Sequence, residues 1–258
     1  SKIFREKFGN KKAKVVTSIA MFYDLEKPLE FVQEIYDILS NDGIWVFEQS
    51  YMPAMLDTIS FDTICHEHLE YYRLKQIDWL MKKVGFRIID IEFNQANGGS
   101  FSVTVAKSAS LFPESPILKK ILLEEERKGF NTLSPYNDFR NKVFQFKLNL
   151  RDLFDKIQNE NGLILGYGAS TKGNVLLQYV GITLKDIPYI GEVNEDKFGS
   201  YTPGTLIPII SEKEAREMNP DYFFVLPWHF KEFIVKKEKL NLDKKVPLLF
   251  PLPTLEIV

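Results

Sequence analysis

The sequence predicts an α/β protein built in two parts. Along most of its 258 residues, short apolar runs of strand length alternate with segments of helical periodicity, the pattern of a sheet covered by helices. The alternation stops once, at 108–135, where three prolines flank a charged helical stretch. We therefore expect a first domain at 1–107, a connector at 108–138 and a second α/β domain at 139–258.

The first domain is expected to contain strands, helices and an antiparallel pair of strands. Apolar residues at helical spacing mark Pro28–Leu39 and Leu74–Val84. Gly43 and Gly85 follow these helices and suit left-handed C-caps. The predicted strands are Ala13–Ile19, Ile44–Phe47, and the antiparallel pair Phe86–Phe93 and Ser100–Ala106.

The first apolar strand has no predecessor in the sequence. Residues 1–8 resemble the end of a charged helix, and Ala13–Ile19 follows directly. A parallel sheet needs several strands joined by crossovers. We therefore expect the chain to be a fragment whose first domain lacks its first half.

The second domain begins with a long amphipathic helix, Phe139–Ile157, and continues in alternation. Its predicted strands are Leu163–Gly166, Tyr189–Val193, Tyr222–Leu226 and Leu248–Phe250, and its predicted helices are Gly173–Val180, Glu212–Met218 and Phe230–Leu240.

Composition narrows the classes of function. The formal net charge of −2 gives no sign of a nucleic-acid or anionic-membrane surface. One cysteine excludes an intramolecular disulfide and suits a reducing cytoplasm. No apolar run reaches the length of a membrane span, and no secretion signal opens the sequence. We expect a cytoplasmic protein with no nucleic-acid or membrane partner; the oligomeric state stays open.

A cluster of titratable residues lies at 61–72, the sequence FDTICHEHLEYY. It holds two of the three histidines and the only cysteine, and it follows a predicted strand, where α/β folds place ligands. Histidine is the side chain best suited to proton transfer near neutral pH. His66 and His68 with Cys65 are a weak metal signal, so no metal site is predicted. An acid–base site and a polar loop without function both remain open.

A second motif, GYGASTKGN at 166–174, joins a predicted strand to a predicted helix. Glycines let the backbone approach a ligand, and a helix N-terminus attracts anions. Ser170, Thr171 and Lys172 add hydroxyls and a cation, which favours a phosphate-bearing ligand. A tight structural turn is the alternative.

Two further polar stretches follow predicted strands. The loop containing Tyr201 either lines a cleft or forms a surface turn. His229 follows a strand at the same edge of the sheet, and it is either a structural histidine at the rim or a functional one.

Together these stretches resemble one family over nearly the whole chain. The matching segments are 61–72, GGS at 98–100, 166–174, KFGSYTPGTLIPI at 197–209 and LPWHF at 226–230. They resemble S-adenosylmethionine-dependent C-methyltransferases that act on nucleotide-linked keto-deoxysugars. The run VTSIAMFYDL at 16–25 resembles the fourth strand of a class I methyltransferase and its following loop.

The resemblance implies the fold and the cofactor. The chain would hold the C-terminal half of a class I methyltransferase sheet followed by a Rossmann-like domain. The family's N-terminal zinc module and its glycine-rich methyl-donor loop have no counterpart in this sequence. S-adenosylmethionine would contact Met21 and Phe22, with most of its site outside this chain.

The resemblance also implies roles for individual residues. His68 occupies the family's base position, supported by Glu67. Cys65 stands where the family usually has tyrosine, so His66 or a backbone N–H would stabilise the enolate. A nucleotide-diphosphate sugar would bind through a set of residues in the second domain: Gly168, Ser170, Thr171, Lys172, Asn174, Tyr201 and His229.

Two other functions remain open. The chain is alternatively a nucleotide-sugar-binding fragment without activity. A nicotinamide oxidoreductase is the other candidate, because Glu192 lies where an acidic residue would bind ribose. Against this candidate, Thr171 replaces the third glycine of the dinucleotide motif.

Overall fold

A computed structural model describes residues 2–240 and 245–258. The chain forms two compact units. The first unit comprises 1–57 and 66–137, and the second comprises 58–65 and 138–258. The chain therefore enters the second unit briefly at 58–65, within the histidine-containing motif, before returning to the first.

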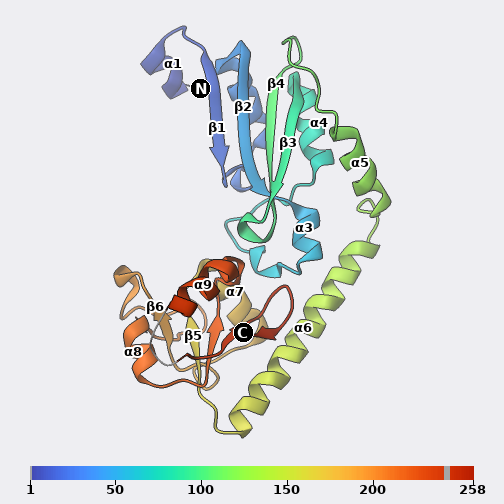
Figure 1. Cartoon of the computed structure of the whole chain (residues 1–258). Coiled ribbons are helices and arrows are strands. Elements are labelled where there is room, and N and C mark those ends of the chain that lie inside the picture. The colour runs from blue at the N-terminus through green and yellow to red at the C-terminus, as the bar shows by residue number, and fades with distance from the viewer. Residues whose placement is uncertain (1, 241–244) are drawn as a thin grey trace. The chain divides into compact units, whose positions relative to one another are not determined.

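The first unit is a four-stranded mixed sheet covered by helices (Figure 1). Its strand order is β1 (Ala13–Ile19), β2 (Leu39–Ser50), β4 (Ser100–Lys107) and β3 (Phe86–Asn94). The β1–β2 pair is parallel, and β4 runs antiparallel to both of its neighbours. The predicted antiparallel pair is thus confirmed. The helices of this unit are α1 (Lys2–Phe8), α2 (Pro28–Ile38), α3 (Met52–Asp57), α4 (Leu74–Val84) and α5 (Leu118–Arg127).

The core of the first unit forms on one face of β2, where every second side chain is buried. Trp45 and Phe47 lie on one face of the strand and are fully buried. Their rings pack against Phe22, which in turn contacts Tyr72, with ring centroids 4.5–5.8 Å apart. Offset and tilted aromatic contacts of this kind add to the burial of apolar surface.

One predicted helix end is confirmed and one is wrong. Gly85 is the left-handed C-cap of α4, with φ of 105°. Gly43, however, lies inside β2, and α2 ends at Ile38 with Leu39 extended. Leu39 is fully buried and pairs with Ala13 of β1, so strand pairing begins directly after the helix and leaves no room for a glycine cap.

Residues 108–137 belong to the first unit rather than forming a separate connector. Leu118 and Ile121 of α5 are buried in its core. The buried Glu125 accepts hydrogen bonds from the backbone N–H groups of Leu74 and Lys75, at 2.7 and 3.1 Å. This carboxylate satisfies two N–H groups at the start of α4, which ties the segment to the sheet.

The second unit contains a six-stranded sheet with a reversal of strand order. The order is β10 (Glu256–Ile257), β9 (Leu248–Phe250), β8 (Tyr222–Val225), β5 (Ile164–Tyr167), β6 (Ile190–Glu192) and β7 (Ile209–Ser211). All pairs are parallel except β9–β10. The chain builds outward from β5 in one direction and then from β8 in the other, which is the Rossmann order.

Four helices accompany this sheet: α6 (Ser134–Asn159), α7 (Thr171–Val180), α8 (Glu212–Glu217) and α9 (Lys231–Leu240). From α6, the buried residues Phe146, Leu150 and Phe154 join the core of the second unit. The strands β7 and β10 are additions to the sequence prediction. At three and two residues, respectively, they are too short to show a period.

The segment 58–65 packs into the second unit through Phe61. Its ring is buried and lies 4.9 Å from the ring of Tyr179 in α7 and 5.6 Å from that of Phe146 in α6. The short helical turn Phe61–Thr63 is therefore anchored by apolar contacts to two helices of this unit.

Close packing of α7 on the sheet requires glycine at position 173. A Cβ added there would lie 2.8 Å from the Cβ of Leu226 and 2.8 Å from Ser170 Oγ. Gly173→Ala should lower the free energy of unfolding by about 1 kcal/mol or more, because overpacking exceeds the gain in helix propensity. Thr171→Ala, at an exposed position of the same helix, is the matched control. Equal midpoints for both variants in urea unfolding would contradict this packing argument.

Candidate functional site

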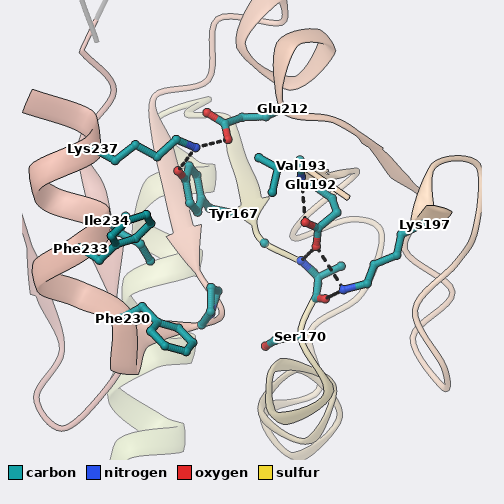
Figure 2. A pocket seen from close by; sticks show the side chains of 14 residues that line it. Tyr167, Ser170, Glu192, Val193, Lys197, Glu212, Phe230, Phe233, Ile234 and Lys237 are labelled. Carbon is teal, nitrogen blue, oxygen red and sulfur yellow. Dashed lines mark hydrogen bonds and ion pairs between the residues drawn. The ribbon is translucent and has the colours of Figure 1, made fainter. Parts of the chain in front are cut away.

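A crevice of about 440 Å³ opens at the carboxyl ends of β5, β6 and β8 (Figure 2). This is where the strand order reverses, the place where open α/β sheets bind ligands. Residues from the turn after β5 and the ends of β6 and β8 line it, together with the start of α9. The volume lies in the range of small-molecule sites, roughly 300–1,000 Å³.

The turn after β5 is held by its own side chains and by Pro227. Gly168 has φ of 78°, and a Cβ there would lie 2.9 Å from Pro227 Cγ, so only glycine fits. Ser170 is the N-cap of α7, and its hydroxyl accepts a hydrogen bond from the N–H of Gly173 at 3.0 Å. The Ser170 hydroxyl therefore has a structural role as a helix cap, in line with the alternative of a tight structural turn.

Glu192, at the end of β6, binds the backbone of this turn. One carboxylate oxygen accepts from the N–H of Ala169 at 2.8 Å, and the other accepts from Val193 and Asn194 at 2.8 and 3.0 Å. Lys197 Nζ lies 3.4 Å from the first oxygen and donates to the Ala169 carbonyl at 2.7 Å.

Burial alone would raise the pKa of the Glu192 carboxyl. The three backbone hydrogen bonds and the Lys197 ammonium outweigh that effect and hold the pKa below its ordinary value. Glu192 is therefore a carboxylate with its acceptor sites already used.

A polar network forms a further side of the crevice (Figure 2). Lys237 Nζ donates to the Tyr167 hydroxyl at 2.9 Å and to Glu212 at 2.6 Å. Tyr167 donates to Glu238 at 3.1 Å, and burial raises the pKa of its hydroxyl to about 12. The hydroxyl thus stays protonated and engaged.

A second cluster, within the second unit, includes the first residues of the 61–72 motif. Asp62 is fully buried, and its Oδ2 accepts a hydrogen bond of 2.7 Å from Trp228 Nε1. Burial raises the pKa of Asp62, opposed by this hydrogen bond and by the Lys172 ammonium. The Lys172 charge therefore acts on Asp62, and Lys172 is not among the residues that line the crevice.

Lys172 is the centre of this cluster. Burial lowers its pKa, whereas the charges of Asp62 and Cys65 raise it. Burial also lowers the pKa of His229 to about 4, and the Lys172 ammonium acts in the same direction. Within the described residues, Asp62 Oδ1 and His229 Nδ1 are buried without a hydrogen-bond partner. Such atoms are costly to bury unpaired, which marks the cluster as a site to test.

His68 lies in the first unit and is held there by the loop after β1. The N–H groups of Leu69 and Glu70 both donate to the Tyr23 carbonyl at 3.1 Å. The Tyr23 ring meets the imidazole edge-on, with centroids 4.5 Å apart. Backbone and ring contacts thus fix the proposed base to the carboxyl end of β1.

Asp24 is a nearby residue that sequence reasoning missed. Burial raises its pKa, the His68 charge lowers it, and Glu67 raises it further. This carboxyl therefore lies in the electrostatic field of both motif residues. Asp24 could have been identified from the sequence as a candidate site residue, because it follows the predicted strand Ala13–Ile19 and its loop.

The structure distributes the predicted site residues over three places. Gly168 and Ser170 line the crevice, and Lys172, His229 and Cys65 gather near Asp62. His68 lies with Tyr23 and Asp24, while His66 and Glu67 are exposed. Of the other predicted residues, Thr171 is exposed, Asn174 is half-buried, and Tyr201 is 61% exposed and bridges to Pro208.

The two predicted cofactor contacts differ in exposure. Met21 is half-buried, but Phe22 is fully buried in the aromatic core. Because its side chain is fully buried, Phe22 can only pack beneath the residues of a cofactor site and cannot contact the cofactor itself.

The described part of the chain contains neither a metal-binding cluster nor a helix suited to span a membrane. No group of three or more His, Cys, Asp and Glu side chains is arranged to hold a metal ion there. None of the helices at 2–240 and 245–258 combines the length and apolarity needed to cross a bilayer.

Comparison with known families settles the relationship. The model of the C-methyltransferase C-terminal domain matches residues 95–253, more than half of the chain, and a methyltransferase domain model matches residues 2–91. The chain belongs to the C-methyltransferase family. The C-methyltransferase NovU of Streptomyces niveus is 29% identical over 229 residues, which is 89% of this chain and 54% of NovU. The chain thus spans about half the length of this relative.

Similarity to solved structures is weaker. LepI in complex with SAM covers 38% of this chain, and 27% of LepI is covered, at 14% identity and a TM-score of 0.33. A methyltransferase structure from Bacillus halodurans covers 40%, with 67% of that chain covered, at 10% identity and a TM-score of 0.31. At such scores neither similarity bears on substrate or mechanism.

The half-buried His229, whose Nδ1 is enclosed, predicts acid sensitivity of the second unit. Its folded pKa of about 4 lies below the ordinary 6.5, so the unfolded state binds more protons between these values. Stability from the neutral imidazole is present above pH 6.5 and lost as pH falls towards 4, by up to about 2–3 kcal/mol. Asp62 acts oppositely, since its raised pKa favours the folded state in acid.

Urea unfolding at pH 7 and pH 5 tests this expectation. His229→Gln should lose less stability between the two pH values than the unchanged protein, with the Asp62 contribution common to both. An equal loss in both proteins would show that His229 does not titrate as a buried group.

Proposed function

We propose that this chain serves S-adenosylmethionine-dependent C-methylation of a nucleotide-linked keto-sugar, with His68 as general base. Family membership and the similarity to NovU support C-methylation. The observation that carries the assignment of the base is the ring contact between His68 and Tyr23. The N–H groups of Leu69 and Glu70, which follow His68, also donate to the Tyr23 carbonyl. A general base needs such fixed placement before its pKa matters.

In the proposed reaction, His68 removes the proton from the carbon beside the sugar ketone. S-adenosylmethionine, when bound, supplies the electrophilic methyl group that this carbon attacks. His68 then holds the proton as an imidazolium. Asp24, in whose field His68 lies, stabilises that cation, and Glu67 adds negative charge from the adjacent position.

The developing enolate oxygen needs a hydrogen-bond donor. A thiol at Cys65 is a poor donor. His66 is exposed and the backbone N–H groups of the motif are near in sequence, so we propose that one of these donates instead. Lys172, whose charge acts on Cys65, adds a positive field to this end of the motif.

The described residues fit part of a methyl-donor site. Met21 is half-buried at the carboxyl end of β1 and offers a flexible thioether to an apolar ligand surface. Phe22 keeps the preceding wall rigid through its ring contacts. We propose that Met21 and the neighbouring backbone contribute one wall of that site.

The nucleotide-diphosphate handle is proposed to bind the C-terminal unit. Lys172 supplies positive charge at the N-terminal turn of α7, with Thr171 and Asn174 on the same turn and Gly168 and Ser170 beside the crevice. His229 and Tyr201 are the remaining proposed contacts. Binding a handle away from the reaction positions the reacting carbon. We further propose a cytoplasmic location, where Cys65 stays reduced.

Two alternatives carry different support. A binding role without catalysis remains compatible with the crevice alone. The nicotinamide alternative is opposed by Glu192, whose oxygens already accept from Ala169, Val193 and Asn194 and so lack free acceptor sites for ribose hydroxyls.

His68→Ala should abolish methyl transfer in the whole protein while methyl-donor binding changes by no more than a few fold. General bases typically contribute ~10²–10⁴-fold. Glu70→Ala is the matched control, because it removes an exposed side chain two positions away that has no proposed role. Retention of more than roughly a hundredth of the rate by His68→Ala would reject the general-base role.

Lys172→Ala should weaken nucleotide-sugar binding and reduce its dependence on salt, because one cationic contact is lost. Lys213→Ala, an exposed lysine of α8, controls for a change in net charge. Titration across a salt series measures both effects. A fall in kcat with unchanged KM would reject contact with the handle and place the action of Lys172 at the reacting centre.

A further inference from the structure

Asp62 is a fully buried acidic residue to which the proposed methyl transfer gives no role. It lies in the short helical turn Phe61–Thr63 of the second unit. Its Oδ2 accepts the hydrogen bond of 2.7 Å from Trp228 Nε1, whereas its Oδ1 has no hydrogen-bond partner among the described residues. Enclosing a carboxyl group in this way is costly unless a nearby positive charge offsets the desolvation. The burial of Asp62 therefore points to a specific electrostatic partner.

The segment 226–228 holds Asp62 and the start of α7 together. Gly173, in the first turn of α7, packs so closely on Leu226 that an added Cβ would lie 2.8 Å from the Leu226 Cβ. Trp228, two residues further along the chain, binds Asp62. Both contacts lie within the second unit. Asp62 is thus fixed close to the residue that precedes Gly173, which is Lys172.

The charges of Asp62 and Lys172 act on each other. Burial lowers the pKa of Lys172, and the negative charges of Asp62 and Cys65 oppose that effect. In return, the Lys172 ammonium opposes the rise that burial causes in the pKa of Asp62. The Lys172 charge also acts on His229, whose pKa of about 4 keeps the imidazole neutral near pH 7. Asp62 therefore favours the charged form of Lys172 against the effect of burial.

We propose that Asp62 is a positioning residue for the nucleotide-diphosphate handle, because its carboxylate keeps the Lys172 side chain an ammonium at the N-terminal turn of α7. A diphosphate is attracted by a charged lysine and by the dipole of the helix, but not by a neutral amine. Asp62 is enclosed and acts through Lys172. This inference rests on the proposed contact between Lys172 and the handle.

Binding of UDP-glucose and dTDP-glucose to the whole protein between pH 6 and pH 8.5, measured by calorimetry, tests this role. Asp62→Asn removes the charge and keeps a carbonyl oxygen for the Trp228 N–H. At pH 8.5 this variant should bind the probes roughly tenfold more weakly than the unchanged protein, the effect of losing one hydrogen bond to a charged group. The difference should shrink at pH 6, where Lys172 is protonated without Asp62. Cys65→Ser in both proteins removes the thiol as another source of pH dependence.

Lys172→Arg in the Asp62→Asn background separates the charge of residue 172 from a general loss of fit. A guanidinium stays charged without a neighbouring carboxylate. Probe binding by the double variant should therefore stay constant between pH 6 and pH 8.5, whereas binding by Asp62→Asn should fall. Asp152→Asn, at an exposed position of α6, is the matched control for the loss of one negative charge and should bind like the unchanged protein.

The proposal is overturned if Asp62→Asn binds the probes as tightly as, or more tightly than, the unchanged protein at pH 8.5. Tighter binding would mean that the acid only repels the diphosphate. A double variant that keeps the pH dependence of Asp62→Asn would also overturn it. Binding that is weakened in Lys172→Ala but not in Asp62→Asn would reject the role of Asp62 alone. An unchanged protein that binds neither probe would reject the handle site, and this inference with it.

The ionisation of Lys172 gives a measurement that does not depend on the folding of the Asp62→Asn variant. NMR of the unchanged protein with isotope-labelled lysine side chains follows the titration, and Lys172→Ala identifies the signal. Lys172 should be an ammonium at pH 7 in the absence of a ligand. A neutral amine at that pH overturns the proposal.

Discussion

The buried hydrogen bond between Trp228 and Asp62 is the contact on which the arrangement of the functional motif depends. It joins residues 166 positions apart at a distance of 2.7 Å, with Asp62 fully buried. A carboxyl group without this partner would be expensive to enclose. Together with Phe61, the bond explains why eight residues of the motif region leave the first unit and fold with the second. The motif is thereby divided between the units, with Cys65 in one and His68 in the other.

Internal carboxylates do similar work elsewhere in the molecule. Glu125 accepts from the first N–H groups of α4, and Glu192 accepts from three N–H groups around the turn after β5. In each case a charged side chain satisfies backbone donors that a helix start or turn leaves open. The same solution has different consequences. Glu125 joins α5 to the start of α4, whereas Glu192 holds the turn after β5 at the edge of the crevice.

Much of the fold was predictable because it depends on local patterns. The antiparallel pair β3–β4 and the cap at Gly85 follow from alternation and from a glycine at a helix end. The prediction failed at Gly43, where an equally suggestive glycine lies within β2, because pairing of Leu39 with Ala13 outweighs the cap. The segment 108–137 also looked like a connector, since its prolines and charges are visible in sequence but the burial of Leu118 and Glu125 is not.

The sequence by itself determined the α/β class, the order of most elements and the positions of the two candidate motifs. These properties follow from periodicity and from residue types, which need no knowledge of distant neighbours. Only the tertiary structure decided which motif residues meet. It joined Trp228 to the buried Asp62, brought Asp62 and His229 under the influence of the Lys172 charge, and tied the turn after β5 to Glu192. These contacts join elements that are far apart in the chain, and their strength comes from burial and hydrogen bonding that exist only once the sheets have formed.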